Sequence, residues 1–245
     1  LIIFAGIVAS LPTVVTRLFA TFDPTKLVTY LILAALSVIT IAGVVLITEA
    51  QRNIPVSYAK RVRGNRMYGG MSTPLPLRIN QAGVIPIIFA ISIMLFPGLI
   101  ANFLIHAQNQ TIVRMATVVN QIFQNQIFYG AMYFVLVVAF TYFYTAVVFD
   151  PNKISENLQK QGGYVPGIRP GRPTAEYLHR VMNRATLAGS IFLGTIAVLP
   201  NVIQGFTGIG TLAIGGTSIL IVVSVVIETV KQIESQLVMR DYEGF

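Results

Sequence analysis

The segment Leu27–Ile47, LVTYLILAALSVITIAGVVLI, contains no charged residue. The hydrocarbon core of a bilayer is about 30 Å thick, and a helix needs roughly 20 apolar residues to cross it. A run of this length is also too long for a β-strand, which usually has about 3–10 residues. The segment therefore predicts a membrane-spanning helix.

Further apolar runs follow along the chain. We expect full spans at Ala82–Ile105, Ile127–Phe149, Ala185–Leu199 and Thr211–Ile227, and the end of another span at Leu1–Val15. The run Ala185–Leu199 is shorter than the others but can gain length from Thr174–Asn183. Pro200 directly follows this run and is expected to end its helix, because proline removes a backbone hydrogen bond and clashes with the preceding turn. The sequence thus predicts an all-α fold, a polytopic membrane helix bundle.

The composition supports the same class. The chain has 245 residues, of which 54% are hydrophobic and only 11% are charged, and its mean hydropathy is +0.72. An ordinary soluble domain carries about 25% charged residues. This excess of apolar residues excludes a typical soluble enzyme, a disordered tail and a fibrous repeat. The absence of cysteine from the sequence excludes disulfides and thiolate chemistry.

Basic residues gather in two long loops, at about residues 50–80 and 150–184. The chain has 17 Lys and Arg against 9 Asp and Glu, for a net charge of +8. Cytoplasmic loops of membrane proteins carry an excess of Lys and Arg. We therefore expect both loops and the C-terminal tail to face the cytoplasm, and the connections at residues 16–26, 106–126 and 201–210 to face outward.

The sequence contains no set of residues that predicts catalysis or metal binding. Gly208–Ala213 fits a G-x-G-x-x-A pattern, but no strand precedes it. His106 and His179 are expected on opposite sides of the membrane, so they cannot share a metal. The first three full spans contain no ionisable residue, which argues against ion-coupled transport. We expect neither enzymatic activity nor a cofactor.

Both basic loops contain glycine or proline residues between their cations, as in Arg63-Gly64-Asn65-Arg66 and Gly167–Pro173. Such residues fix turns, so we expect ordered hairpins that present arginines. Arginine makes bidentate contacts with phosphate and carboxylate, which fits docking of a large acidic or RNA-bearing partner. The alternative is that the positive-inside bias alone accounts for the charge.

Pro86 and Pro97 interrupt the run Ala82–Ile105, which follows polar Asn80 and Gln81. Proline inside a helix favours a kink, and a kinked span can act as a moving gate. Prolines are also common in membrane helices that do not move. The residues alone leave both interpretations open.

Four segments carry a resemblance to the bacterial SecY family, the central subunit of a protein-conducting channel: Gln51–Arg61, Ser72–Pro86, Gly167–Thr174 and Gly215–Val223. The chain resembles the end of the fifth span and the sixth to tenth spans of a ten-span fold, one of its two pseudo-symmetric halves. The resemblance implies a span end plus an outward hinge linker at residues 1–26. It implies a five-helix half with the two cytoplasmic loops and the tail at residues 27–245.

The resemblance also implies roles for individual residues. The pore ring would include Ile3, Ile88 and Ile221, and the lateral gate would include Asn80, Gln81, Pro86, Ser92 and Phe96. The residues that dock a ribosome or a motor would be Lys60, Arg61, Arg63, Arg66, Arg169 and Arg172. Implied partners are SecE, SecG, the SecA ATPase, the ribosome with its RNA, the translocating polypeptide with its signal sequence, and the lipid bilayer. The implied location is the bacterial inner membrane.

The expected function is therefore that of a pore-forming subunit, which conducts unfolded polypeptide and releases hydrophobic segments into lipid. Two alternatives are a small-solute secondary transporter and a membrane anchor that docks ribosomes without conducting anything. A transporter would need buried charges or a polar substrate site in its spans, and the sequence shows neither.

Overall fold

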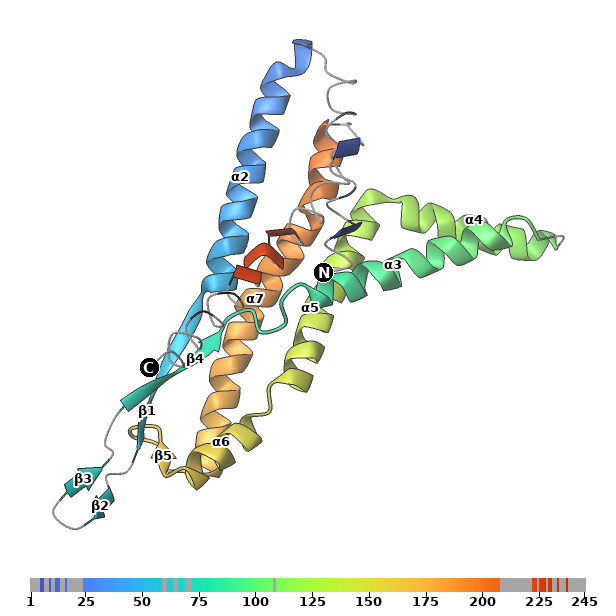
Figure 1. Ribbon diagram of the computed structural model, residues 1–245. Coiled ribbons are helices and arrows are strands. Elements are labelled where there is room, and N and C mark those ends of the chain that lie inside the picture. Colours follow the sequence, from blue (N-terminus) through green and yellow to red (C-terminus); the bar gives the residue numbers. More distant parts are fainter. Residues whose placement is uncertain are drawn as a thin grey trace. The chain divides into compact units, whose positions relative to one another are not determined.

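The computed structural model of the chain describes residues 24–58, 61–63, 66–68, 72–107 and 109–207, with isolated positions within residues 5–16 and 222–237. The elements that fall in the continuous ranges (Figure 1) are the 3-10 helix η1 (Pro24–Lys26), the helices α2 (Leu27–Glu49), α3 (Ile85–Leu104), α4 (Gln110–Gln124), α5 (Gln126–Val148), α6 (Pro151–Lys160) and α7 (Arg172–Thr207), and the strands β1 (Gln51–Tyr58), β2 (Arg61–Arg63), β3 (Arg66–Tyr68), β4 (Ser72–Arg78) and β5 (Gly163–Tyr164).

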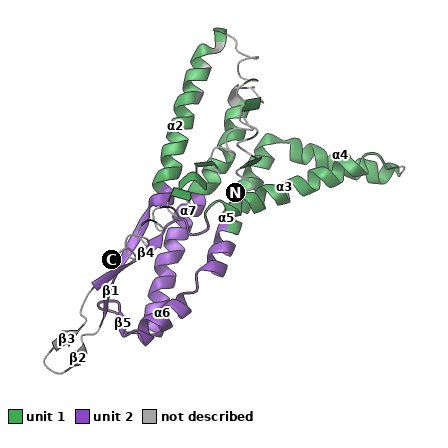
Figure 2. Cartoon of the chain, in the orientation of Figure 1, with its two compact units in different colours: residues 1–46, 83–140, 192–245 green, residues 47–82, 141–191 purple. Residues whose placement is uncertain are grey.

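The chain forms two compact units (Figure 2). The first unit consists of residues 1–46, 83–140 and 192–245, and the second of residues 47–82 and 141–191. Helices α2, α5 and α7 contribute residues to both. Each unit has its own apolar core, and each is described separately below.

The core of the first unit is built from α2, α3, α5 and α7. Its buried side chains are Val44, Ile87, Ala90, Met94, Tyr133, Val137, Leu193, Ile196 and Ala197. Gly194 allows a close approach of α7 to α5, since a Cβ at this position would lie 2.7 Å from the ring of Phe134. Helix α4 lies antiparallel beside α3 (Figure 1), and Asn120 donates to Asn102 over 3.1 Å.

The second unit combines a β-ribbon with α6 and the first part of α7. Strand β1 pairs antiparallel with β4, in a register that sets Gln51 opposite Arg78, and it pairs with β5 on its other side. Because side chains alternate between the two faces of a strand, Ile54 and Leu77 come from the same face of the ribbon. They share a buried cluster with Leu178, Val181 and Met182 of α7, together with Phe149 and Val165.

Three prolines lie within the ribbon at positions that the pairing allows. Pro55 is opposite Pro74, and Asn53 is opposite Pro76. The two pairs are two residues apart, so they have the same hydrogen-bonding character in an antiparallel ladder. Since proline has no N–H to donate, these are the pairs that exchange no hydrogen bond between β1 and β4. The long loop is therefore a regular hairpin despite its prolines.

The described residues contain four helical segments that are long and apolar enough to cross a membrane: Tyr30–Glu49, Ile85–Leu104, Gln126–Lys160 and Arg172–Gly205. The helices predicted at Leu27–Ile47, Ala82–Ile105 and Ile127–Phe149 are thereby confirmed, and the polytopic helical fold with them. The segments Thr211–Ile227 and Leu1–Val15 fall mostly outside the described residues.

Several expected boundaries are wrong. Helix α7 begins at Arg172, inside the expected loop, and continues through Pro200 to Thr207. Proline removes only its own N–H from the helix, and a membrane helix can re-satisfy the freed carbonyl locally. Helix α3 begins at Ile85 rather than Ala82 because Gly83 has a φ of +62°. The expected outward linker at residues 106–126 contains a regular helix, α4, whose N-cap Asn109 accepts from Thr111 N.

Candidate functional site

The chain enters α3 through a bend at residues 79–84. In the second unit, Asn80 is buried and Gln81 is half-buried. The backbone there runs close to α7, since a Cβ added to Gly189 would lie 3.0 Å from the carbonyl oxygen of Ile79. In the first unit, Pro86 occupies the first turn of α3, where proline costs no helical hydrogen bond. The five expected gate residues thus divide between the two units.

Three of the predicted residues follow one face of α3. Ile88, Ser92 and Phe96 are spaced by four residues, and such residues are neighbours on a helix. Ser92 Oγ donates to the carbonyl of Ile88 over 2.7 Å, a side-chain bond that bends helices slightly. Ile88 is half-buried, whereas Phe96 is 62% exposed.

The opposite face of α3 packs into the first unit. Ile87, Ala90 and Met94 are almost fully buried there. Phe89 and Ile93, which lie on the side of Phe96, remain 51% and 42% exposed. Helix α3 is therefore held by one face and presents a second apolar face outward.

The pore ring cannot be assembled from the described residues. Ile88 is its one expected member within them, because Ile3 and Ile221 lie outside the described residues. The role of these three residues stays a prediction.

The middle of the first basic loop contains a second, smaller ribbon, in which β2 pairs with β3. Its register places Arg63 opposite Arg66 and Arg61 opposite Tyr68. Lys60 lies outside the described residues. The expected arginine hairpin is thus confirmed in its backbone pairing, and the register sets two arginines at directly opposed positions.

The second basic loop is fixed by two buried hydroxyl groups. Ser155 Oγ donates to the carbonyl of Gly171 over 2.6 Å, and Thr174 Oγ1 donates to the carbonyl of Arg169 over 2.8 Å. Both side chains are nearly inaccessible, at 3% and 2%. Gly167 and Gly171 have φ angles of +83° and +94°, a region that favours glycine.

This fixed loop presents two predicted docking residues. Arg169 and Arg172 are both exposed. Arg172 Nε lies 3.1 Å from Glu176 Oε1, one turn along α7, so part of its hydrogen-bonding capacity is used within the helix. The anchors Ser155 and Thr174 were not among the residues predicted from sequence. Pro173 could have indicated that a helix starts here, because proline is common at the beginning of a helix.

The end of α5 is joined to α6 through Asp150, the N-cap of α6. Its Oδ1 accepts from the backbone N–H groups of Asn152 and Lys153 over 3.0 and 3.3 Å. The hydrogen bond from Lys153 N–H is the largest of the influences that hold the pKa of the Asp150 carboxyl below its ordinary value. Lys153 Nζ also lies 3.4 Å from Asp150 Oδ2.

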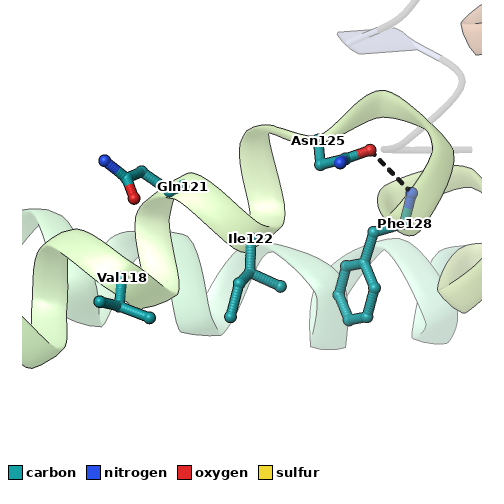
Figure 3. Close-up of a pocket in the computed structure, with 5 residues that line it drawn as sticks. All are labelled: Val118, Gln121, Ile122, Asn125 and Phe128. Atoms are coloured by element: carbon teal, nitrogen blue, oxygen red, sulfur yellow. Dashed lines mark hydrogen bonds between the residues drawn. The ribbon is translucent and has the colours of Figure 1, made fainter.

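A shallow groove lies between α4 and the start of α5, with a volume of about 330 Å³. Figure 3 shows Val118, Ile122 and Phe128 on its lining, with Asn125 Oδ1 accepting from Phe128 N over 3.3 Å. Its lining residues carry no charge. None of the residues predicted from sequence lines it.

Among the described residues, no group of three or more His, Asp or Glu side chains is arranged to hold a metal ion. The potentially functional features of the described residues are therefore a span with partly exposed apolar side chains, the paired strands β2 and β3 of the first basic loop, and the second basic loop that Ser155 and Thr174 fix. These features, on several membrane-length helices, define a polytopic helical membrane protein.

The chain belongs to the SecY family, whose family model matches residues 1–230. It is 46% identical to a protein translocase subunit SecY of Thermotoga maritima, over the whole chain and 54% of that relative. It is 45% identical to the Mycobacterium bovis subunit of the same name, over 56% of that relative. The chain thus spans about half the length of these relatives.

Two solved structures share the fold. One, described as a protein-conducting channel, has a TM-score of 0.56 at 19% identity and matches 96% of this chain and 56% of its own. The other describes a SecY protein whose plug domain stabilises the closed state of the translocation channel. It has a TM-score of 0.57 at 17% identity and matches 97% of this chain and 59% of its own.

Proposed function

We propose that this chain forms half of the pore-forming subunit of a protein translocase. In this role it conducts unfolded secretory polypeptides across the bacterial inner membrane and releases hydrophobic segments into lipid through a lateral gate that includes α3. The subunit is a passive conduit, without a catalytic step or a cofactor, and a partner drives transport.

The observation that carries the proposal is the two-faced packing of α3. Its inner face is buried in the first unit, while Phe89, Ile93 and Phe96 are partly exposed on another side of the helix, where Phe89 also stacks on Phe140 of α5. Branched and aromatic side chains of this kind can exclude water from a constriction and still contact a moving polypeptide without specific hydrogen bonds. Membership of the SecY family supports the same role.

The basic loops support docking of an anionic partner from the cytoplasm. The loop that carries Arg169 is held by Ser155 and Thr174, so the backbone from which this exposed side chain projects is fixed. Because guanidinium pairs well with phosphate and carboxylate, we propose that the ribosome with its RNA, or the SecA ATPase, docks here. SecE and SecG are the proposed membrane partners. Both loops and the tail then face the cytoplasm.

The pore assignment is tested by crosslinking in the complete translocase with a stalled translocating chain. A photoreactive side chain is placed at Ile88 or Ile221, and at Met115 as the matched control. Met115 lies in the same unit as Ile88 and is 67% exposed on α4. We expect adducts from Ile88 and Ile221 and none from Met115. Equal yields at all three positions, or no adduct at the first two, would contradict the proposal.

The docking assignment is tested by charge reversal. Arg169→Glu should lower translocation strongly while the amount of subunit in the membrane stays the same. The control is Lys160→Glu, which reverses an exposed cation of the same unit that pairs with Glu156 at 2.8 Å. If both variants lower translocation equally, or neither does, Arg169 is not a specific docking residue.

The two alternatives make different predictions in the same preparation. A small-solute transporter would show uptake that depends on a proton or sodium gradient. A non-conducting anchor would bind ribosomes without any protease-protected intermediate of the translocating chain.

A further inference from the structure

A groove in the second unit lies between the start of α6 and the first half of α7. It has a volume of about 550 Å³ and is lined by Pro151, Asn152, Ala175, Glu176, His179, Arg180 and Asn183. All of these residues lie in the stretch 150–184 of the second basic loop, but none of them is among the individual residues assigned above to the pore, the gate or partner docking.

The lining itself contains one cation, Arg180, and one carboxylate, Glu176, whereas the segments that flank the groove carry an excess of positive charge. The segments 150–153 and 172–184 contain four cations, Lys153, Arg172, Arg180 and Arg184, and two carboxylates, Asp150 and Glu176. Both carboxylates are already paired, with Lys153 and Arg172 respectively. Among the described residues, Arg180 and Arg184 have no such partner, and both are exposed.

The position of the groove along α7 places it at the edge of the membrane. The apolar run begins at Ala185, directly after Arg184 and five residues after Arg180. At a rise of 1.5 Å per residue, the two arginines lie about 1.5 and 7.5 Å below that run. The headgroup layer on each side of a bilayer is roughly 5–8 Å thick, so both side chains fall within it.

The same face of α7 becomes apolar immediately above the groove. Leu187 and Ile191 follow Asn183 at spacings of four residues, and they are 52% and 48% exposed. Residues at this spacing are neighbours on a helix. The groove therefore offers cationic and amide groups at headgroup depth, continuous with an apolar strip at acyl-chain depth.

We propose that this groove binds an anionic phospholipid. Arg180 and Arg184 contact its phosphate, Asn152 and Asn183 supply hydrogen-bond donors, and an acyl chain lies along Leu187 and Ile191. A basic pocket beside spans at the membrane surface is a common form of lipid headgroup site. The proposal rests on the chain being a membrane protein and is independent of the proposed translocation.

The test is lipid binding by the intact protein in detergent, delipidated and titrated with phosphatidylglycerol or phosphatidylcholine, with bound lipid read by native mass spectrometry. We expect phosphatidylglycerol to be preferred. A surface cation contributes attraction that corresponds to about a fivefold change in affinity. Arg180→Gln and Arg184→Gln should therefore each weaken phosphatidylglycerol binding about fivefold.

Lys160→Gln is the matched control, because it removes one exposed cation of the same unit outside the groove. It should leave lipid binding unchanged. Thermal unfolding of each variant in detergent shows whether the fold is retained. Equal binding of the two lipids by the wild type, or equal losses in Lys160→Gln and Arg180→Gln, would overturn the proposal.

Two further measurements distinguish a lipid from a free phosphate. Leu187→Gln should weaken phosphatidylglycerol binding by disrupting the apolar strip, and millimolar glycerol 3-phosphate should compete poorly. If Leu187→Gln has no effect and glycerol 3-phosphate displaces the lipid completely, the groove is a site for soluble phosphate and the lipid assignment is wrong.

Discussion

The first unit buries Val137 in its core and the second buries Leu178, and both side chains are fully inaccessible. The surfaces around these two cores differ. The first unit exposes large apolar side chains along whole helices, including Phe103 at 82% and Ile127 at 84%. In the second unit, exposed residues include the cations Arg169, Arg180 and Arg184, while large exposed apolar side chains concentrate near Phe143–Val148 and Leu187–Ile191.

The two units therefore have the same kind of apolar interior but differ in the residues that they expose. Burial of apolar side chains away from solvent stabilises each unit regardless of what surrounds it. The surface then follows the medium, with apolar residues where lipid is expected and cations where water and anionic groups are expected. Core substitutions should therefore destabilise both units alike, whereas the effect of a surface substitution should depend on the unit in which it lies.

The largest effect is expected in the core of the second unit. Leu178→Ala removes a fully buried side chain from the cluster with Val181 and Met182, and it should lower the free energy of unfolding by about 3 kcal/mol. The measurement is equilibrium unfolding in mixed detergent micelles. Leu187→Ala, at a position 52% exposed on the same helix, should cost much less. Similar losses in the two variants would contradict the assignment of Leu178 to a packed core.

A smaller effect is expected from a pair of glycines in the first unit, with opposite signs. A Cβ at Gly194 would lie 2.7 Å from the Phe134 ring, so Gly194→Ala should destabilise the protein by about 1–3 kcal/mol through overpacking. Gly98 has no atom within 4 Å of such a Cβ, so Gly98→Ala in α3 should stabilise it by about 0.5–1 kcal/mol. Thermal unfolding in the same detergent measures both. If the two variants shift the midpoint in the same direction, the close approach of α7 to α5 is wrong.

The smallest effect concerns the charge at the start of α6. Hydrogen bonds to Asp150 lower its pKa in the folded state, so its ionised form contributes stability above the ordinary value of about 3.9. That contribution is lost as the pH falls through the lowered pKa. Asp150→Asn keeps the capping oxygen but not the charge. It should unfold slightly below the wild-type temperature at pH 7 and match the wild type at a pH where Asp150 is protonated. A difference that is constant across this range would show that the charge has no role.

The spans could be predicted from sequence because their signal is local. An uninterrupted run such as Leu27–Ile47 needs a helix wherever it lies in lipid, and α2 covers it. The boundaries depended on features with weaker local signals. Gly83 delays α3 through a positive φ, and Pro200 does not end α7 because proline removes only its own N–H and the freed carbonyl can be satisfied locally. Helix α4 was missed because it is polar on one side, although Asn109 and the apolar spacing of Ile112, Met115 and Val119 favour a helix.

The candidate site could be predicted only in part. Exposed cations such as Arg169 stand out in a chain with few charges. The residues that fix the loop cannot be recognised in this way. Ser155, for example, lies in α6 and donates a hydrogen bond to the carbonyl of Gly171, which is sixteen residues away. The groove beside Arg180 likewise depends on two helices meeting, which no local pattern encodes. The residues Ile88, Ser92 and Phe96 could be placed on one face, because helical spacing alone determines that.

The prolines of the β-ribbon have a consequence for solubility. In the ladder they occupy pairs that exchange no hydrogen bond with β1, so at Pro74 and Pro76 the backbone nitrogens of β4 are directed to its outer edge. A strand that approached this edge could not accept a backbone hydrogen bond at these two positions, because proline has no N–H. Edge strands that lack donors resist unplanned pairing with other chains. The prolines therefore make β4 a poor template for the addition of a further strand and so for aggregation.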